Sequence, residues 1–514
     1  MTLILAKVVA LELNADMKVN HAACFPSSSD SRDETIAGGL DRRAFLRRSL
    51  VLGCGCAFCF HAASVFARPP LPTVTTLISP GCRRSKVKVA KLYLGVPKAH
   101  WPTPKMDLEG ERKRYEAAFD QMHKEFADVD FLVNQLVTKN EELNNIQDKL
   151  READGVLLVH LSMGMGGVIR EVLAAKRPTM LFAAPYSGHE WAGFGALRNE
   201  PLGGNLECLL TSDLRELAVA VRPFRAIHHL REAKILNVTS RPLPAAYTQA
   251  IAGKFGTEIK VTDLGRMMAA YQAVDPKAAE EETRRWIKGA VKVVEPPRQE
   301  VFNSCRLGLA FEQLMAEENA TCITVDCYGS MYRALPAFPC VGFVRLNDMG
   351  LAGICESDLK SAMTFLLLQG LSGRPGFISD PTVDESKQAI ILAHCLGSRR
   401  MDGPDGPAQP YKLRTIMERQ EGCVPQVQMR VGQKVTQAWL VGTGKLQYFT
   451  GEIIESPDTE RGCRTKMMVK VDGDIERLWQ NWSQGLHRVT CYGDVTPDLK
   501  RFCRFKELQL VNEA

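Results

Sequence analysis

Apolar and polar positions follow two different patterns along the chain. The first half shows short apolar runs separated by amphipathic stretches. The apolar runs predict buried strands at residues 89–96, 129–137, 155–161 and 178–184. Between them, apolar residues recur at three- and four-residue steps, which predicts helices at 108–126, 140–152 and 168–176. Strands that alternate with helices in this order are typical of a doubly wound α/β domain.

The same alternation continues through the middle of the chain. It predicts strands at 234–238, 258–262, 321–325 and 341–346, and helices at 214–232, 265–274, 276–292 and 301–319. This pattern indicates a second α/β domain. We expect the neighbouring His228 and His229 to belong to a helix surface, because adjacent helical residues point to different faces.

Beyond residue 385 the rhythm changes to short runs of alternating apolar and polar residues, at 389–395, 426–431, 434–442, 446–455 and 464–471. Such runs are typical of an antiparallel sheet. The predicted fold is therefore α/β, with two doubly wound α/β domains at 68–204 and 205–384 and an antiparallel β-rich domain at 385–514.

Segment 355–381 carries two carboxylates at the ends of a predicted helix, 357–372, and a short strand, 376–379. If 341–346 is the preceding strand, the unit is a parallel crossover, whose strands end at one edge of the sheet. Glu356 and Asp380 would then face one pocket, as a metal site or an acid/base pair requires. The alternative is a Glu at a helix N-terminus and a turn Asp before Pro381.

A metal site needs a third ligand, and His487 is the best candidate. It lies in the segment GLHRVTCYGD, between a Trp-bearing predicted helix and a turn bounded by glycine. His394, near the end of the predicted strand 389–395, is the second candidate. The alternative for His487 is a core histidine with satisfied hydrogen bonds.

Composition narrows the function classes. The net charge of +6 on 514 residues is small and not concentrated in a run, so nucleic-acid binding has no support. No window of twenty apolar residues occurs, and we expect no membrane-spanning helix in the processed chain. Four of the sixteen cysteines precede residue 68, and the remaining twelve form no CxxC pair, which indicates neither a zinc ribbon nor a dense disulfide framework.

Residues 1–67 have the features of a twin-arginine export signal. Arg42 and Arg43 are followed by an apolar run at 50–60 and by a small-x-small cleavage pattern at 65–67. We expect export to the periplasm or the medium; the alternative is a basic amphipathic helix. The stretch before the arginines is long for such a signal, which leaves Met1 and Met17 as alternative starts.

The carboxylate pair of 355–381, followed far downstream by GLHRVTCYGD and the terminal FKELQLVNEA, resembles the L-fucose isomerase family and its relative L-arabinose isomerase. The resemblance implies two α/β domains, a β domain, and one divalent cation, usually Mn²⁺, bound by Glu356, Asp380 and His487. It also implies a homo-oligomer, a trimer or hexamer, in which the N-terminal domain of a neighbouring subunit completes the pocket.

The chemistry that this resemblance implies is the interconversion of an aldose and a ketose through an ene-diol, a reaction of carbohydrate metabolism. A metal bound by two carboxylates and an imidazole would act as a Lewis acid on a monosaccharide. We expect Glu356 and Asp380 to share the acid/base work. The residues considered for substrate binding are Asp326, His189, Trp191, Arg488 and His394.

Several of these residues have a second interpretation. Asp326 could orient the substrate or simply cap a helix or turn, and the loop with His189 and Trp191 could be a plain surface loop. By analogy with the family, that loop or Trp101 would serve the site of another subunit. Two other functions remain open: an exported sugar-binding protein without activity, and a metal-dependent hydrolase or lyase acting on a carbohydrate.

Overall fold

The computed structural model describes residues 85–483 and 485–514, so the predicted export signal at 1–67 lies outside the described residues. The first part is a parallel five-stranded sheet with the strand order β2-β1-β3-β4-β5. Its strands are β1 (Val87–Leu94), β2 (Val129–Val137), β3 (Gly155–His160), β4 (Thr179–Ala183) and β5 (Leu206–Leu210). The sequence predicted the first four of these strands; β5 was not predicted.

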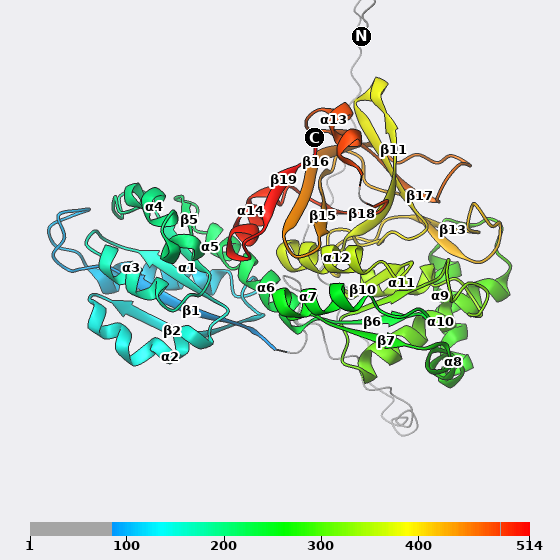
Figure 1. Ribbon diagram of the computed structural model, residues 1–514, viewed down its shortest axis with the longest axis horizontal. Coiled ribbons are helices and arrows are strands. Elements are labelled where there is room, and N and C mark those ends of the chain that lie inside the picture. The colour runs from blue at the N-terminus through cyan, green and yellow to red at the C-terminus, as the bar shows by residue number, and fades with distance from the viewer. Residues whose placement is uncertain (1–84, 484) are drawn as a thin grey trace, which may run out of the picture. The chain divides into compact units, whose positions relative to one another are not determined.

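The helical segments of this first part connect its strands (Figure 1). They are α1 (Leu108–Gln121), the 3₁₀ segment η1 (Asn140–Ile146), α2 (Gln147–Glu152), α3 (Gly166–Leu173), α4 (Trp191–Arg198) and the 3₁₀ segment η2 (Pro201–Asn205). Two apolar cores pack on the sheet, one containing Tyr93 and Phe182 and the other Leu92 and Leu158. Strands buried on both faces explain why their sequences read as continuous apolar runs.

A second parallel sheet has the order β10-β9-β6-β7. Its strands are β6 (Lys234–Val238), β7 (Glu258–Thr262), β9 (Cys322–Val325) and β10 (Ala352–Cys355). Helix α5 (Glu216–Ala220) still packs on the first sheet, whose core contains Leu217 and Ala220. The helices in the region of the second sheet are α6 (Arg222–Glu232), α7 (Ala245–Phe255), α8 (Leu264–Ala273), α9 (Pro276–Gly289), α10 (Arg298–Glu317), α11 (Cys340–Asp348) and α12 (Leu359–Ser372). The prediction of helix 357–372 is confirmed by α12.

The predicted strand at 341–346 is wrong, because these residues belong to α11. Nearly every side chain of α11 is buried, and a short apolar run buried on all sides has the same sequence pattern as a buried strand. The strand that precedes Glu356 is β10 instead.

The C-terminal part contains a sheet with the order β15-β18-β11-β12-β17-β16-β19, which an additional pairing of β15 with β16 closes into a ring of six strands. The strands of this sheet are β11 (Phe377–Asp384), β12 (Ala389–His394), β15 (Lys434–Val441), β16 (Lys445–Glu455), β17 (Thr465–Val471), β18 (Arg488–Tyr492) and β19 (Gln509–Asn512). All pairs are antiparallel except β16 with β19. The fold is thus parallel α/β sheets with an antiparallel barrel, which agrees with the predicted class.

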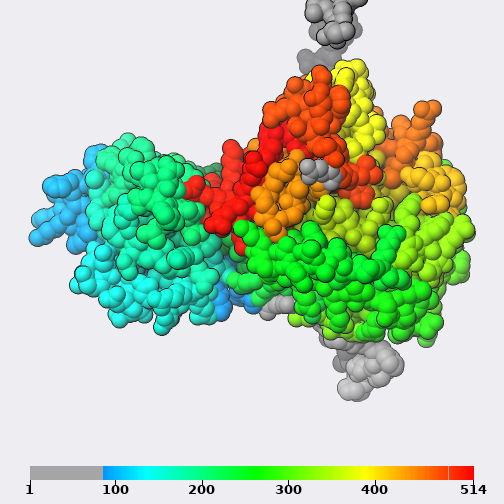
Figure 2. Space-filling model, viewed as in Figure 1, coloured from blue at the N-terminus to red at the C-terminus, as the bar shows by residue number. Residues whose placement is uncertain are grey.

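The remaining elements complete this region. The small third sheet joins β8 (Lys292–Val293) to β13 (Tyr411–Arg414) and β14 (Val424–Val427), and the other segments are the 3₁₀ turn η3 (Glu385–Lys387), α13 (Ile475–Asn481) and α14 (Thr496–Phe505). In the space-filling view the orange and red C-terminal residues lie directly against green residues of the middle of the chain (Figure 2). No helix within the described residues is sufficiently long and apolar for a membrane span.

The predicted parallel crossover between the strand before Glu356 and the strand of Asp380 is wrong. Strand β10 belongs to the middle parallel sheet, whereas β11 pairs antiparallel with β12 and β18 in the barrel. Helix α12 connects the two, and its buried side chains share one apolar core with residues of both sheets. The two carboxylates therefore come from two different sheets that α12 holds together.

Candidate functional site

Glu356 lies in a tight turn between β10 and α12. Both Glu356 and Ser357 have positive φ, 62° and 53°, a conformation that costs a non-glycine residue on the order of 1 kcal/mol or more. The turn is fixed to the parallel sheet, because the amide of Ser357 donates to the carbonyl of Val325 and its hydroxyl donates to Asn237 Oδ1. Strain held in place by the surrounding sheet is typical of a functional position.

Asp380 and His487 are neighbours across two barrel strands. In the register of β11 and β18, Ser379 pairs with Arg488, so the next step brings Asp380 opposite His487. His487 Nε2 lies 3.3 Å from Asp380 Oδ1 and 3.8 Å from Glu356 Oε2. His487 therefore lies between the two predicted carboxylates, as the sequence analysis expected of a third ligand.

His394, at the end of β12, belongs to the same cluster. Its Nε2 lies 3.8 Å from Glu356 Oε1, and its ring centroid is 5.3 Å from that of His487. Two sets of residues could each hold a metal ion, because the possible ligand atoms within each set all lie within 4.8 Å of one another. One set is Asp380, His394 and His487, and the other is Cys355, Glu356 and His394. His394 is common to both sets.

Asp358 is a functional residue that the sequence analysis missed. As the N-cap of α12 it accepts hydrogen bonds from the amides of Lys360 and Ser361, and its Oδ2 lies 3.0 Å from His487 Nδ1. A carboxylate on Nδ1 fixes the ring and leaves Nε2 free to bind a metal. The signal was present in the sequence, since an Asp directly before a predicted helix is a favourable N-cap.

The electrostatics of the cluster follow from burial and from the carboxylates. Burial alone would lower the pKa of His487, but hydrogen bonds to Asp358 and Asp380 raise it to about 10. Burial and the nearby His487 lower the pKa of His394 to about 4. Burial also raises the pKa of Glu356 above its usual value, which the charge of His487 partly offsets. The site thus concentrates titratable groups with opposite shifts, as catalytic sites often do.

A cavity of about 490 Å³ opens beside this cluster. Glu356, Asp358 and His487 form part of its wall, and the other lining residues come from β6, the segment after it, the start of α12 and the barrel. Two cationic side chains, Arg241 and Lys360, are among them, and Lys360 Nζ lies 5.4 Å from the centroid of the Trp439 ring. The volume is sufficient for a small polar molecule.

Asp326, one of the residues considered for substrate binding, lies behind this wall. Asp326 is buried and accepts hydrogen bonds from Thr239 and Ser330, and its Oδ2 lies 3.1 Å from Arg241 Nε. Asp326 therefore holds two residues of the cavity wall, Thr239 and Arg241, without lining the cavity itself.

Arg488 is directed away from Asp380. Its guanidinium packs between the rings of Trp439 and Trp482, donates to the carbonyls of Gly485 and His487, and lies 3.4 Å from Glu513 Oε1. Arg488, considered for substrate binding from the sequence, is not among the residues that line the cavity, and its contacts support the segment of His487 instead.

His189 and Trp191 are not among the residues that line the cavity. They lie beyond β4 in the first parallel sheet, where the ring centroids of His189 and Trp101 are 4.8 Å apart. Tyr186 and Trp191 in the same loop are exposed by 75% and 48%. Within the described part of one chain, the predicted aromatic loop forms a separate exposed cluster.

The side chains of the cluster fit a divalent cation. Two ligand atoms that each lie about 2.1 Å from one ion are separated by about 3.0–3.5 Å at octahedral or tetrahedral angles. The separation of 3.3 Å between His487 and Asp380 falls in this range, and the 3.8 Å to Glu356 is slightly longer. Two carboxylates with imidazole nitrogens suit Mn²⁺, Mg²⁺ or Zn²⁺.

The chain is similar in sequence to two proteins named sulfoquinovose isomerase. A protein from Alkalicoccus urumqiensis named sulfoquinovose isomerase is 24% identical over 316 residues, which are 56% of this chain and 67% of that protein. A second protein of that name, from Clostridium sp. (strain MSTE9), is 27% identical over 209 residues, 38% of this chain and 44% of the relative. The chain is thus a relative of sugar isomerases.

The predicted class, an isomerase acting on a sugar, agrees with the names of both relatives. The predicted resemblance is confirmed at the level of sugar isomerases, and the narrower assignment to the fucose/arabinose group stays a prediction. No family model matches the chain. The second alignment spans less than half of that relative's own length.

Proposed function

We propose that the chain is a metal-dependent aldose–ketose isomerase whose substrate binds in the cavity beside Glu356. The observation that carries the proposal is the position of His487, whose Nε2 faces both Asp380 and Glu356 while Asp358 holds Nδ1. The similarity to two proteins named sulfoquinovose isomerase supports the same reaction class.

The proposed ligands are Glu356, Asp380 and His487, with His394 as the neighbouring nitrogen. Mn²⁺ is the proposed ion, or another divalent cation that accepts carboxylate and imidazole ligands. When bound, such an ion supplies Lewis acidity to the sugar carbonyl and stabilises negative charge on oxygen. Asp358 keeps the His487 ring in the orientation that directs Nε2 toward the carboxylates.

The proton transfer is assigned to Glu356, with Asp380 as its partner. Isomerisation requires that a base remove a proton from a carbon bearing a hydroxyl and that an acid return a proton to the adjacent carbon. Glu356 is on the cavity wall, and burial raises its pKa, so its carboxyl can hold a proton nearer neutral pH than an exposed glutamate.

The proposed substrate is a monosaccharide, and the cavity wall suits one that carries an anionic substituent. Arg241 and Lys360 both line the cavity, and Asp326 Oδ2 lies 3.1 Å from Arg241 Nε. Arginine and lysine are the usual partners of negatively charged oxygen groups. Sulfoquinovose, a sulfonated sugar and the substrate in the names of both relatives, is therefore the first compound to test.

Proton NMR in D₂O tests the reaction directly. Purified protein with Mn²⁺ is incubated with sulfoquinovose and with neutral aldoses and ketoses. We expect deuterium to enter the sugar as aldose and ketose interconvert, and Glu356→Gln and Asp380→Asn to abolish this exchange. Asp384→Asn, a carboxylate change at the far end of β11, is the matched control and should retain it.

Other outcomes of the same experiment would overturn the proposal. Products that have gained water or lost a fragment would indicate a hydrolase or lyase. Tight sugar binding with no deuterium incorporation, unaffected by EDTA, would indicate a sugar-binding protein. Full exchange in either carboxylate variant would remove Glu356 or Asp380 from the mechanism.

We also propose that the working enzyme is an oligomer in which the loop with His189 and Trp191 reaches the cavity of another subunit. Two observations support this: Tyr186 and Trp191 are exposed, and neither residue lines the cavity of its own chain. Mixing inactive Glu356→Gln with inactive Trp191→Ala should restore part of the activity, because some mixed sites contain neither change. A monomer in sedimentation experiments, or mixtures that stay inactive, would contradict it.

Export through the twin-arginine pathway is proposed from the sequence of residues 41–67. Changing both Arg42 and Arg43 to lysine should leave the full-length protein in the cytoplasm, whereas the unchanged chain is recovered outside it. Cell fractionation followed by N-terminal sequencing makes the measurement. Equal distribution of the two proteins would contradict the proposal.

A further inference from the structure

A second cluster of side chains of types that can bind a metal lies outside the proposed active site. Cys395 directly follows β12, Glu418 lies in the segment between β13 and β14, and Cys463 lies just before β17. One possible ligand atom from each of the three lies within 4.8 Å of the other two. Cys463 Sγ is 3.4 Å from Glu418 Oε1.

The cluster is separate from the active-site histidines even though Cys395 follows His394 in the chain. Successive residues of an extended strand direct their side chains to opposite faces. His394 faces Glu356, whereas Cys395 is grouped with residues of two distant loops. The exposure of the three side chains increases from Cys395, which is buried, through Cys463 to Glu418, which is exposed, so an ion can enter from solvent.

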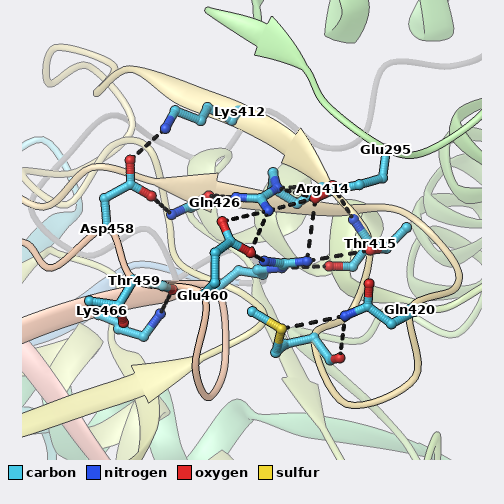
Figure 3. Close-up of polar contacts among 12 residues, drawn as sticks. Glu295, Lys412, Arg414, Thr415, Gln420, Gln426, Asp458, Thr459, Glu460 and Lys466 are labelled. Atoms are coloured by element: carbon cyan, nitrogen blue, oxygen red, sulfur yellow. Dashed lines mark hydrogen bonds and ion pairs between the residues drawn. The ribbon is translucent and has the colours of Figure 1, made fainter.

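A network of charged side chains holds the two loops in place (Figure 3). Arg414, at the end of β13, binds Glu295 and Glu460, and its Nη2 lies 2.9 Å from both Glu460 oxygens. Arg464, directly after Cys463, donates to the Thr415 carbonyl at 2.8 Å and to Glu460 at 2.8 Å. Both arginine side chains are nearly fully buried.

This network connects the segment before Glu418 to the segment that carries Cys463. Buried arginines held by several carboxylate and carbonyl oxygens have little freedom to move. The ligand atoms of Glu418 and Cys463 are therefore brought together by the fold before any ion binds, which lowers the entropic cost of binding.

We infer that Cys395, Glu418 and Cys463 bind a zinc ion. Zinc takes thiolate sulfur at about 2.3 Å and carboxylate oxygen at about 2.0 Å in a tetrahedral arrangement, which places sulfur and oxygen about 3.5 Å apart. The observed 3.4 Å between Cys463 and Glu418 matches this spacing. Two thiolates favour zinc over the harder ions proposed for the active site, and a water completes the fourth position.

The proposed zinc joins the end of β12 to two loops, one of which leads into β17, the strand that pairs with β12. Its role is structural, since a metal that bridges three segments distant in sequence stabilises the folded state by its binding free energy. The disulfide Cys395–Cys463 is the competing arrangement; it would leave Glu418 without a function in the cluster.

Cobalt spectroscopy and metal analysis test the inference on the full chain. We expect zinc in the protein as purified, and after replacement by Co²⁺ a thiolate-to-metal charge-transfer band in the near ultraviolet. Cys463→Ser should weaken this band and lower zinc affinity by at least about tenfold. Cys355→Ser, beside Glu356, and Cys208→Ser, in β5, are the controls and should leave both unchanged.

A variant that changes an exposed residue separates loss of the ligand from loss of the fold. Glu418→Gln should lower zinc affinity while the cobalt–thiolate band persists. A band that is unchanged in Cys463→Ser or lost only in Cys355→Ser would overturn the inference, as would a Cys395–Cys463 disulfide found by peptide mapping of the protein as purified. Deuterium exchange into sugar is measured separately and tests the proposed isomerase.

Discussion

Single side chains account for the geometry of the candidate site. Asp358 caps α12 with the same carboxylate that holds His487, so one residue joins the start of a helix to the proposed metal ligand beside β18. The pair explains why His487 presents Nε2 to Asp380 and Glu356. A second carboxylate that orients a ligand histidine is a common feature of metal sites.

The substitution Asp358→Asn separates these two tasks. Asparagine is as good an N-cap as aspartate, so thermal stability should change little. The substitution does remove the negative charge of the Asp358 carboxylate that faces His487 Nδ1. We expect Mn²⁺ affinity and isomerase activity to fall about 10- to 100-fold. The same change at Asp474, the N-cap of α13, should affect neither. Unchanged Mn²⁺ affinity in Asp358→Asn would remove Asp358 from the site.

Much of this residue-level picture was accessible from the sequence. Glu356, Asp380 and His487 were chosen as ligands, and the structure brings all three to one cluster with His394. Asp358 was missed because its partner is 129 residues away, a contact that local patterns do not reveal. The contacts of Arg488 with two tryptophan rings and Glu513 were not accessible from the sequence either, because they depend on the tertiary fold.

At the level of helices and strands, the packing of α10 on α11 explains why the predicted strand at 341–346 was wrong. Gly308 and Gly342 face each other so closely that a Cβ on either would lie 2.8 Å from the other's Cα. This close approach buries α11 on nearly all sides, so its sequence at 341–346 lacks the alternation of apolar and polar positions that marks a helix with one exposed face. The antiparallel partners of β11 were equally hidden, since strand direction follows from long-range pairing.

The close approach makes a prediction about stability. Gly342→Ala should lower the free energy of unfolding by about 1–3 kcal/mol, because backbone atoms of α10 and the ring of Phe311 occupy the space of the added methyl. Gly253→Ala, in α7 with open space around it, should instead stabilise the protein by up to about 1 kcal/mol. Urea unfolding of both variants makes the comparison, and equal effects would contradict the packing argument.

For the whole described chain, α6 is the connecting element. Phe224 belongs to a core of the first sheet, whereas Ala226 and Leu230 belong to the core shared by the middle sheet and the barrel. Arg225 and His228 bind Asp128 and Asp154, which precede β2 and β3. The expectation that His228 and His229 lie on a helix surface is therefore wrong: both are buried.

His228 gives the stability of the molecule a specific pH dependence. Burial alone would lower its pKa, but Asp154 and Glu232 raise it to about 9, above the unfolded value of about 6.5. The stabilisation is therefore fully present below pH 6.5 and is lost as the pH rises through 9. Between pH 6.5 and pH 9, the free energy of unfolding should fall by about 1–3 kcal/mol less in His228→Gln than in the unchanged protein.

Urea unfolding at pH 6.5 and at pH 9 makes this measurement. His123→Gln, at an exposed histidine after α1, is the control and should follow the unchanged protein at both values. A loss of stability between the two pH values that is the same with and without His228 would contradict the assignment.

Mn²⁺ binding is the most direct test of the claim that Glu356, Asp380 and His487 form one metal site. Electron paramagnetic resonance of metal-free protein titrated with Mn²⁺ counts the bound ions per chain. The account predicts one tightly bound Mn²⁺, lost or strongly weakened in Asp380→Asn and in His487→Gln and retained in Asp384→Asn and in Cys463→Ser. Equal Mn²⁺ binding by the unchanged protein and by a variant lacking all three ligands would contradict it.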